Sequence, residues 1–216
     1  QEFVAKRLPV LLQGLPNGGA KAVECVVDLS CNQLKSPAPL ASLLRQLRQA
    51  PVHTTVLRLH KNQLGDTAAA VLAEHIQDAA AASRPLMQLH LSNNALSAAG
   101  IQLLIEAAHR CGGYPRAADA ARLTSMGKAD GARRALWLRT EHQWPPVAEA
   151  QALLDRCKAA GNPVCIMQKG EDPPPDAVVQ MHFGFTHVAD QFGKGKGKAA
   201  ADSEPKGKGK GNGKDK

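Results

Sequence analysis

Residues 86–96 (LMQLHLSNNAL) constrain the fold more than any other part of the chain. Leu89 and Leu91 alternate with polar residues. This alternation predicts a short β-strand with one buried face, because side chains along a strand point alternately to opposite sides. Asn94 follows the strand, and a short amide side chain stabilises a tight bend by bonding neighbouring backbone groups. The segment therefore predicts a strand that ends in an asparagine-stabilised turn.

The same pattern occurs twice earlier in the chain. Asn32 follows a strand-like segment that starts at Val23, and Asn62 follows another that starts at Val56. The three turn asparagines lie 30 and 32 residues apart. Between them, apolar residues recur at helical spacing, which predicts a helix after each strand. The buried positions expected in the first two helices are Leu40, Leu43, Leu44, Leu47, Ala68, Val71, Leu72 and Ile76.

This pattern, L-x-x-L-x-L-x-x-N-x-L, resembles the signature of leucine-rich-repeat proteins. The length of the repeat, with a full helix in each copy, is similar to the ribonuclease-inhibitor-like class. The resemblance covers residues 20–111 well and 132–168 poorly. It implies an α/β leucine-rich-repeat solenoid, shaped as a short curved horseshoe. Parallel strands would line the concave face and helices the convex face, and the residues between the inward leucines would bind a partner.

A fourth strand is predicted at Leu136 and Leu138, after a break in the period. This spacing aligns Trp137 with His90 on the preceding strand. Glu141 stands where the turn asparagine is expected, so this turn must be built differently.

These features divide the chain into four parts. Residues 1–19 are interpreted as an N-terminal helical cap, or as the remnant of a preceding repeat. Residues 20–168 hold the repeats, with an insertion at 112–131 and a last edge strand around 164–166. Residues 169–193 are interpreted as an irregular C-terminal cap over the last repeat, since an open end of a repeat array needs cover.

Residues 194–216 form a Gly/Lys-rich segment that predicts a disordered tail. Its eight lysines against three carboxylates give +5 of the chain's formal net charge of +8. Such a tail attracts phosphates without sequence preference, although it also suits a purely solubilising role. The expected polyanion-binding residues are Lys194, Lys196, Lys198, Lys206, Lys208 and Lys210.

Several classes of function are disfavoured by the composition. Five cysteines without regular spacing argue against a disulfide framework and favour an intracellular compartment, cytoplasmic or nuclear. Neither a C-x-x-C pair nor a regular histidine spacing is present, so no metal and no cofactor is predicted. No apolar run reaches the ~18–20 residues that a membrane span requires, and no small-molecule substrate is predicted.

The outward strand positions predict a basic, partner-binding surface with one large aromatic residue. Trp and Arg dominate interface hot spots, so Trp137 is interpreted as its anchor. The alternative is that these are ordinary solvated positions on a sheet. The candidate partner-binding residues are Asp28, Arg58, His60, Lys61, His90, Trp137 and Arg139.

Cys31 is a candidate for a catalytic role, because it is predicted to lie near His60 as a nucleophile lies near a base. No orienting group or oxyanion site accompanies the pair, so an enzyme is not predicted. The sequence favours non-enzymatic protein recognition, with an RNA- or polyanion-associated protein as the alternative. A third interpretation, a fragment of a longer array without activity of its own, is suggested by the start at Gln1.

Overall fold

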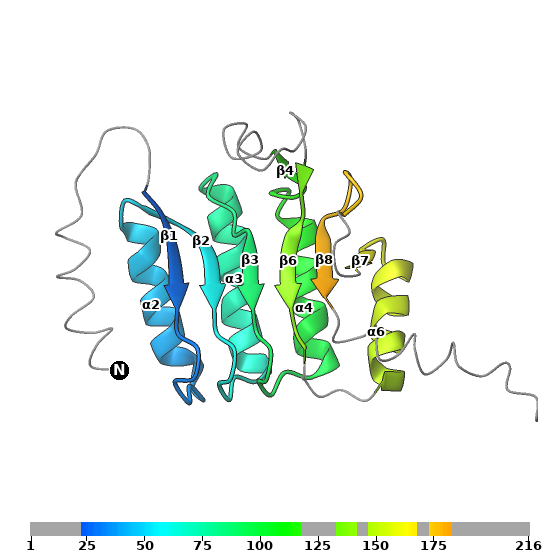
Figure 1. The fold of residues 1–216 in the computed structure, drawn as a ribbon, viewed down its shortest axis with the longest axis horizontal. Helices are drawn as coiled ribbons and strands as arrows, with labels where there is room; N and C mark the ends of the chain where they lie inside the picture. The colour runs from blue at the N-terminus through cyan, green and yellow to red at the C-terminus, as the bar shows by residue number, and fades with distance from the viewer. Residues whose placement is uncertain (1–22, 118–132, 142–146, 168–172, 183–216) are drawn as a thin grey trace, which may run out of the picture.

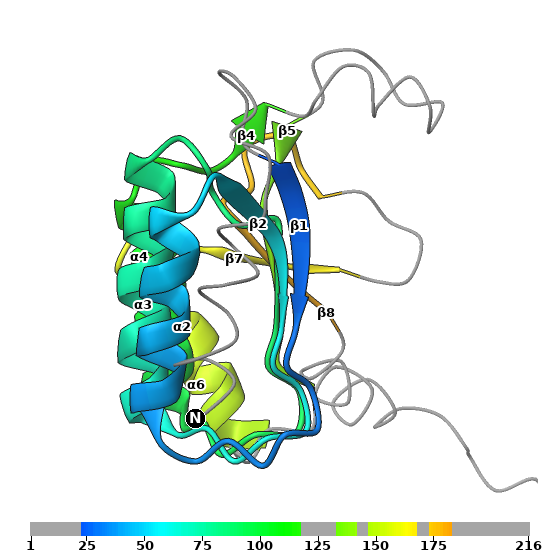
Figure 2. The ribbon, with the colours of Figure 1, turned by 90° about the vertical axis from the view of Figure 1, so that its left-hand side faces the viewer.

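The computed structural model describes residues 23–117, 133–141, 147–167 and 173–182. These residues form an α/β structure with a six-stranded sheet in which all neighbouring strands are parallel. The helices pack on one face of this sheet (Figures 1 and 2). The predicted strand–helix alternation and parallel sheet are therefore confirmed.

The first three strands each precede a helix. They are β1 (Val23–Asp28), α2 (Pro37–Gln49), β2 (Val52–Arg58), α3 (Asp66–Ala81), β3 (Gln88–His90) and α4 (Ala98–Arg110). The later part of the chain adds three more strands of this sheet and one helix: β6 (Leu136–Arg139), α6 (Val147–Ala159), β7 (Val164–Met167) and β8 (Val179–His182). A separate antiparallel pair consists of β4 (Arg116–Ala117) and β5 (Arg133–Arg134).

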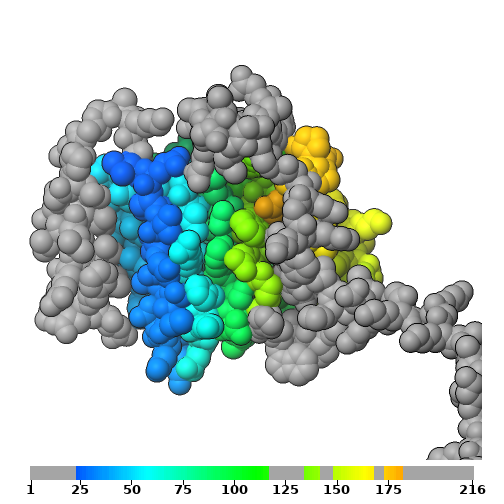
Figure 3. Space-filling view, in the orientation of Figure 1, coloured from blue at the N-terminus to red at the C-terminus, as the bar shows by residue number. Residues whose placement is uncertain are grey.

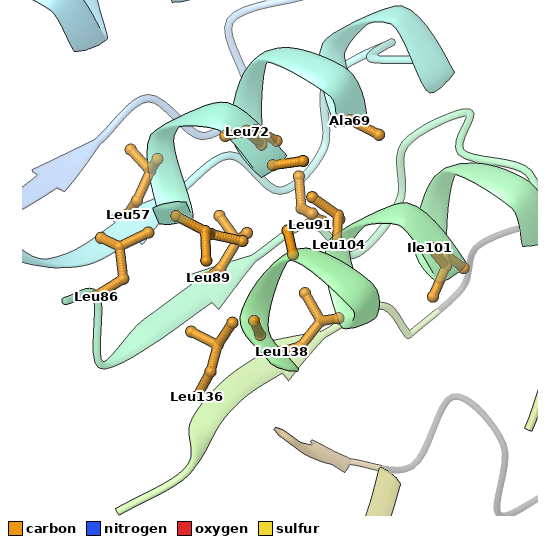
Figure 4. Packing of buried hydrophobic residues seen from close by; sticks show 14 of the residues in the cluster. Leu57, Ala69, Leu72, Leu86, Leu89, Leu91, Ile101, Leu104, Leu136 and Leu138 are labelled. Atoms are coloured by element: carbon orange, nitrogen blue, oxygen red, sulfur yellow. The ribbon is translucent and has the colours of Figure 1, made fainter. Parts of the chain in front are cut away.

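The core lies between the sheet and the helices. Leu57, Leu89 and Leu138 are paired across β2, β3 and β6, and all three are fully buried. They point toward the apolar faces of the helices (Figure 4). Burying a leucine side chain contributes roughly 1.5–3 kcal/mol, so this in-register row is a main source of cohesion between the layers. The predicted inward leucines are thus core residues.

The turn asparagines form a hydrogen-bonded ladder along one end of the sheet. Asn62 Oδ1 accepts bonds from the backbone N–H groups of Asn32 and Leu34, both at 3.0 Å. Its Nδ2 donates to the carbonyl oxygens of Leu29 at 2.9 Å and Leu59 at 2.8 Å.

Asn94 continues the ladder one unit further. It accepts from the N–H of Leu64 at 3.1 Å and donates to the carbonyl oxygens of Leu59 and Leu91. Each amide therefore binds backbone groups of its own turn and of the turn before it.

The alignment predicted for β6 is wrong by two residues. Leu138 pairs with Leu89, and Trp137 pairs with Gln88, so Arg139 is the residue opposite His90. Because side chains alternate with period two, a shift of two residues keeps the same residues facing the core. Hydrophobic spacing alone therefore does not distinguish the two alignments.

The described part of the predicted C-terminal cap includes a strand of the sheet, β8. This strand lies between β6 and β7, and its Val179 and Met181 are fully buried. β7 is the edge strand, as predicted, but it pairs with β8. Within the segment interpreted as an irregular cap, residues Val179–His182 are therefore a regular strand of the sheet.

Parts of the domain interpretation lie outside the described residues. They are the N-terminal cap (1–19), residues 20–22, 132, 142–146 and 168 of the repeats, residues 118–131 of the insertion, residues 169–172 and 183–193 of the cap, and the tail (194–216).

We expect Asn62→Ala to lower the free energy of unfolding by about 2–4 kcal/mol, because it leaves several backbone groups at the turns without their partner. Asn32→Ala is the matched control, because the exposed Asn32 amide donates to the nearby Ser30 carbonyl at 3.0 Å. It should cost less than about 1 kcal/mol. Urea unfolding at neutral pH measures both, and equal losses would contradict the ladder's structural importance.

Candidate partner-binding surface

The side of the sheet turned away from the helices carries the predicted partner-binding residues. We call this side the strand face, and in Figure 3 its strands β1, β2, β3 and β6 lie side by side. Side chains alternate along each strand, so the neighbours of the buried leucines point to this face. The residues that define it are Val26, Asp28, Val56, Arg58, Gln88, His90, Ser92, Trp137, Arg139 and Glu141.

One row of charged and polar side chains crosses four adjacent strands. Backbone pairing places Asp28 beside Arg58, Arg58 beside His90, and His90 beside Arg139. Arg58 Nη1 lies 3.3 Å from Asp28 Oδ2, and both side chains are 44% exposed. The structure thus brings four of the seven predicted site residues into one row.

Trp137 lies two residues before the row on its strand, on the same face of the sheet, and it contacts two of the row's members. Its ring centroid is 5.9 Å from that of His90, in an edge-to-face arrangement. The guanidinium carbon of Arg139 lies 5.6 Å from the Trp137 ring centroid, within the range of a cation–π interaction. Trp137 is half-buried. The predicted anchor is therefore part of a packed cluster formed by His90, Trp137 and Arg139.

Glu141 is a member of this surface that the sequence interpretation missed. Its Oε1 accepts a hydrogen bond from Arg139 Nε at 3.0 Å, and its Oε2 accepts one from the Ser92 hydroxyl. The Glu141 side chain is 13% exposed. The spacing of Arg139 and Glu141 is the sequence feature that predicts their contact, because residues two apart on an extended chain project to the same side.

The carboxylates of the strand face remain ionised. Burial raises the pKa of Glu141, but hydrogen bonds from Ser92, from its own backbone N–H and from Arg139 outweigh burial, so the pKa is lowered. Hydrogen bonds from the Ser30 hydroxyl and backbone N–H, together with Arg58, lower the pKa of Asp28 to about 2.

The surface is close to neutral rather than strongly basic. The cationic side chains of Arg58 and Arg139 each lie beside a carboxylate, from Asp28 and Glu141 respectively. Lys61 is exposed in the turn after β2, where its N–H donates to Ser92 O at 2.9 Å. Local pairing leaves an excess of one positive charge among these five residues.

The two remaining residues of the sequence analysis, His60 and Cys31, lie in neighbouring turns. Cys31 N donates to His60 O at 3.0 Å, which places these turns next to each other. Within the described part of the chain, the contact between them is this backbone bond. A nucleophile–base pair would require contact between the His60 ring and the Cys31 thiol, whereas this bond joins backbone atoms.

Among the described ranges, no group of three or more His, Cys, Asp or Glu residues is placed to hold a metal ion. No helix in these ranges is long and apolar enough to cross a membrane. The six candidate polyanion-binding lysines lie outside the described residues.

Comparison with known proteins adds no family to these observations: no protein-family model matches the chain, and no curated protein matches its sequence.

His90 should stay neutral well below its ordinary titration range. Burial, with the positive charges of Arg139 and Arg58, lowers its pKa from 6.5 to about 4. We expect NMR titration of the His90 ring to show this, and Arg139→Gln to raise the pKa toward 6.5. Because the folded-state pKa is depressed, the stability that the neutral ring supports is present above pH 6.5 and lost as pH falls toward 4.

Arg110→Gln is the matched control for the His90 titration, since Arg110 is an exposed arginine on α4 that pairs with Glu106. It should leave the His90 pKa unchanged. An ordinary pKa for His90 in the unaltered protein would contradict the burial and charge environment described above.

Proposed function

We propose that this chain is a leucine-rich-repeat solenoid of the ribonuclease-inhibitor-like class and a non-enzymatic protein-recognition module. In this proposal the strand face is the concave side of a short horseshoe. The support is that β1–α2, β2–α3 and β3–α4 are successive strand–helix units in one parallel sheet. Two of their turn asparagines, Asn62 and Asn94, make equivalent bonds to their own unit and to the preceding one.

The observation that carries the functional proposal is the cluster of His90, Trp137 and Arg139. Hot spots of protein interfaces are enriched in Trp and Arg and are surrounded by residues that exclude water. Here the Trp137 ring is held between neighbours before any partner binds. A side chain that is already positioned loses less conformational entropy on binding. The cluster is therefore a suitable anchor for a protein partner.

Pairing of charges on the strand face supports a protein partner over a polyanion at this surface. A nucleic acid gains most of its affinity from cations that neutralise phosphates. Arg58 and Arg139 already interact with carboxylates, which reduces what they offer to phosphates. An interface built on an aromatic anchor does not need an excess of positive charge.

We expect Trp137→Ala to weaken binding of a captured protein partner at least about tenfold, since truncation of a hot-spot residue costs 2 kcal/mol or more. The partner would be isolated with the intact chain in the presence of nuclease and moderate salt, then purified, and its Kd measured with each variant. Arg139→Ala should also weaken binding, while Arg110→Ala, on the helix side, should not. Unchanged affinity for Trp137→Ala and Arg139→Ala in folded proteins would exclude the strand face as the interface.

The alternative function, binding of RNA or another polyanion, rests on the Lys-rich segment 194–216. We expect a labelled 20-nucleotide oligouridylate to bind the intact chain weakly and to lose affinity steeply with salt, because the binding would come from counterion release. Residues 1–193 alone should not bind it. If the shortened chain binds as well as the intact one, and Arg58→Gln abolishes this binding, the polyanion site lies on the strand face instead.

A further inference from the structure

A small cavity lies between the helix layer and the sheet, at the end where β2 begins. It has a volume of about 70 Å³ and is partly open to solvent. Its wall is mainly apolar. Its lining includes Arg48, Val52, His75, Ala79, Ala82 and Arg84.

Two buried polar side chains line the cavity, Thr54 and His75 of α3, and the Thr54 hydroxyl lies 3.6 Å from Cys25 Sγ. His75 is 5% exposed, and neither of its ring nitrogens has a hydrogen-bond partner in the described part of the chain. Leaving a buried polar group unpaired is unfavourable, because the group loses its bonds to water without a replacement. A buried histidine that lines a cavity without a protein partner is available to bond a molecule in the cavity, either water or a ligand that displaces it.

The protonation of His75 defines what that molecule must offer. Burial, with the charge of Arg48, lowers the pKa of His75 from 6.5 to about 4. At neutral pH the ring is thus uncharged, with one nitrogen that donates and one that accepts. A hydroxyl group complements either nitrogen, because it both donates and accepts.

The arginines around the cavity indicate a neutral ligand. Arg48 forms an ion pair with Asp78. Arg84 Nη1 donates to the carbonyl oxygens of Ala50 at 3.3 Å and Val52 at 3.0 Å. Both guanidinium groups are therefore engaged by groups of the chain, and an anionic ligand would have to compete for them.

Size limits the ligand further. A volume of about 70 Å³ exceeds the roughly 10–15 Å³ that one water needs on the same measure and falls below the roughly 150 Å³ of an engineered cavity that encloses benzene. Because the cavity is partly open, a ring or short alkyl chain fits with part of its surface at the mouth.

We propose that this cavity is a binding site for a small, neutral, mainly apolar molecule with one hydroxyl group, which hydrogen-bonds to His75 and packs its apolar part against Val52 and Ala79. The site lies on the helix side of the sheet, away from the strand face. It adds a small-molecule ligand to the proposed function and does not depend on the strand face binding a protein.

Phenol is the probe for this proposal, and toluene is its control of similar shape without the hydroxyl. Titration of the intact chain, followed by the NMR signals of the His75 ring nitrogens, should show saturable binding of phenol with a Kd on the order of 1 mM, as expected for a ligand of this size. Toluene should bind at least about tenfold more weakly, because it leaves His75 unpaired.

Two variants locate the site. Ala82 is exposed and lines the cavity, so the larger side chain of Ala82→Met should close its mouth. Because the methionine then occupies the space that phenol needs, phenol should bind at least about tenfold more weakly. Ala81→Met is the matched control, since Ala81 is the exposed neighbour outside the lining, and it should bind phenol normally. His75→Leu should remove the preference for phenol over toluene.

The proposal is overturned if phenol leaves the His75 ring signals unmoved, if toluene binds the unaltered chain as tightly as phenol, or if Ala82→Met binds phenol normally. Circular dichroism of each variant confirms that it is folded. Should His75→Leu fail to fold, the comparison of Ala82→Met with Ala81→Met still decides the location. Loss of protein-partner binding in the strand-face variants would leave these results unchanged.

Discussion

The side-chain amide of Asn62 is the interaction on which the arrangement of the first three strands depends. At the end of a strand the chain turns away from the sheet, and its backbone groups lose their ladder partners. Unpaired backbone groups in a buried position are costly. Asn62, itself 6% exposed, binds backbone groups of its own turn and of the turn that follows β1. The ladder therefore stabilises each turn and fixes its position, along the strand direction, relative to the neighbouring turn. Once the positions of the turns are fixed, the strands are held in register, and Asp28, Arg58 and His90 lie in one row across the strand face.

The sequence was sufficient to predict the parts of the fold that rely on alternation and on this amide. The strands around Leu57 and Leu89, the helices that follow them and an edge strand at Val164–Met167 are present as expected. The position of β6 was not predictable in the same way. Glu141 offers no amide to form the ladder, so only hydrophobic alternation remained as a guide. Alternation does not distinguish a strand from the same strand shifted by two residues. The result is that Arg139, and not Trp137, lies opposite His90.

A second limit of the sequence concerns the order of strands. Val179 and Met181 showed the alternation of a strand, but the pattern does not state where in a sheet the strand lies. If the strand–helix units stack in chain order, all residues after β7 are expected to lie beyond the edge of the sheet. The chain instead returns to insert β8 between β6 and β7. This position buries Val179 and Met181 completely, whereas at an edge they would cover less apolar surface. Burial that requires contacts distant in sequence is not visible in local spacing.

Glu141 also explains how the strand face presents an aromatic anchor without an excess of charge. An arginine above an indole ring must keep its position to remain there, and the Arg139 side chain has many rotamers in solution. The bond from Arg139 Nε to Glu141 restricts those rotamers, and the Ser92 hydroxyl in turn holds the Glu141 carboxylate. Arg139 then limits the motion of the Trp137 ring from one side, and His90 limits it from another. Because the charge of Arg139 is compensated locally, a partner that covers this cluster does not have to supply a carboxylate of its own. Recognition at the strand face therefore depends more on the shape and apolar surface around Trp137 than on net charge, which is concentrated in the Lys-rich C-terminal segment of the sequence.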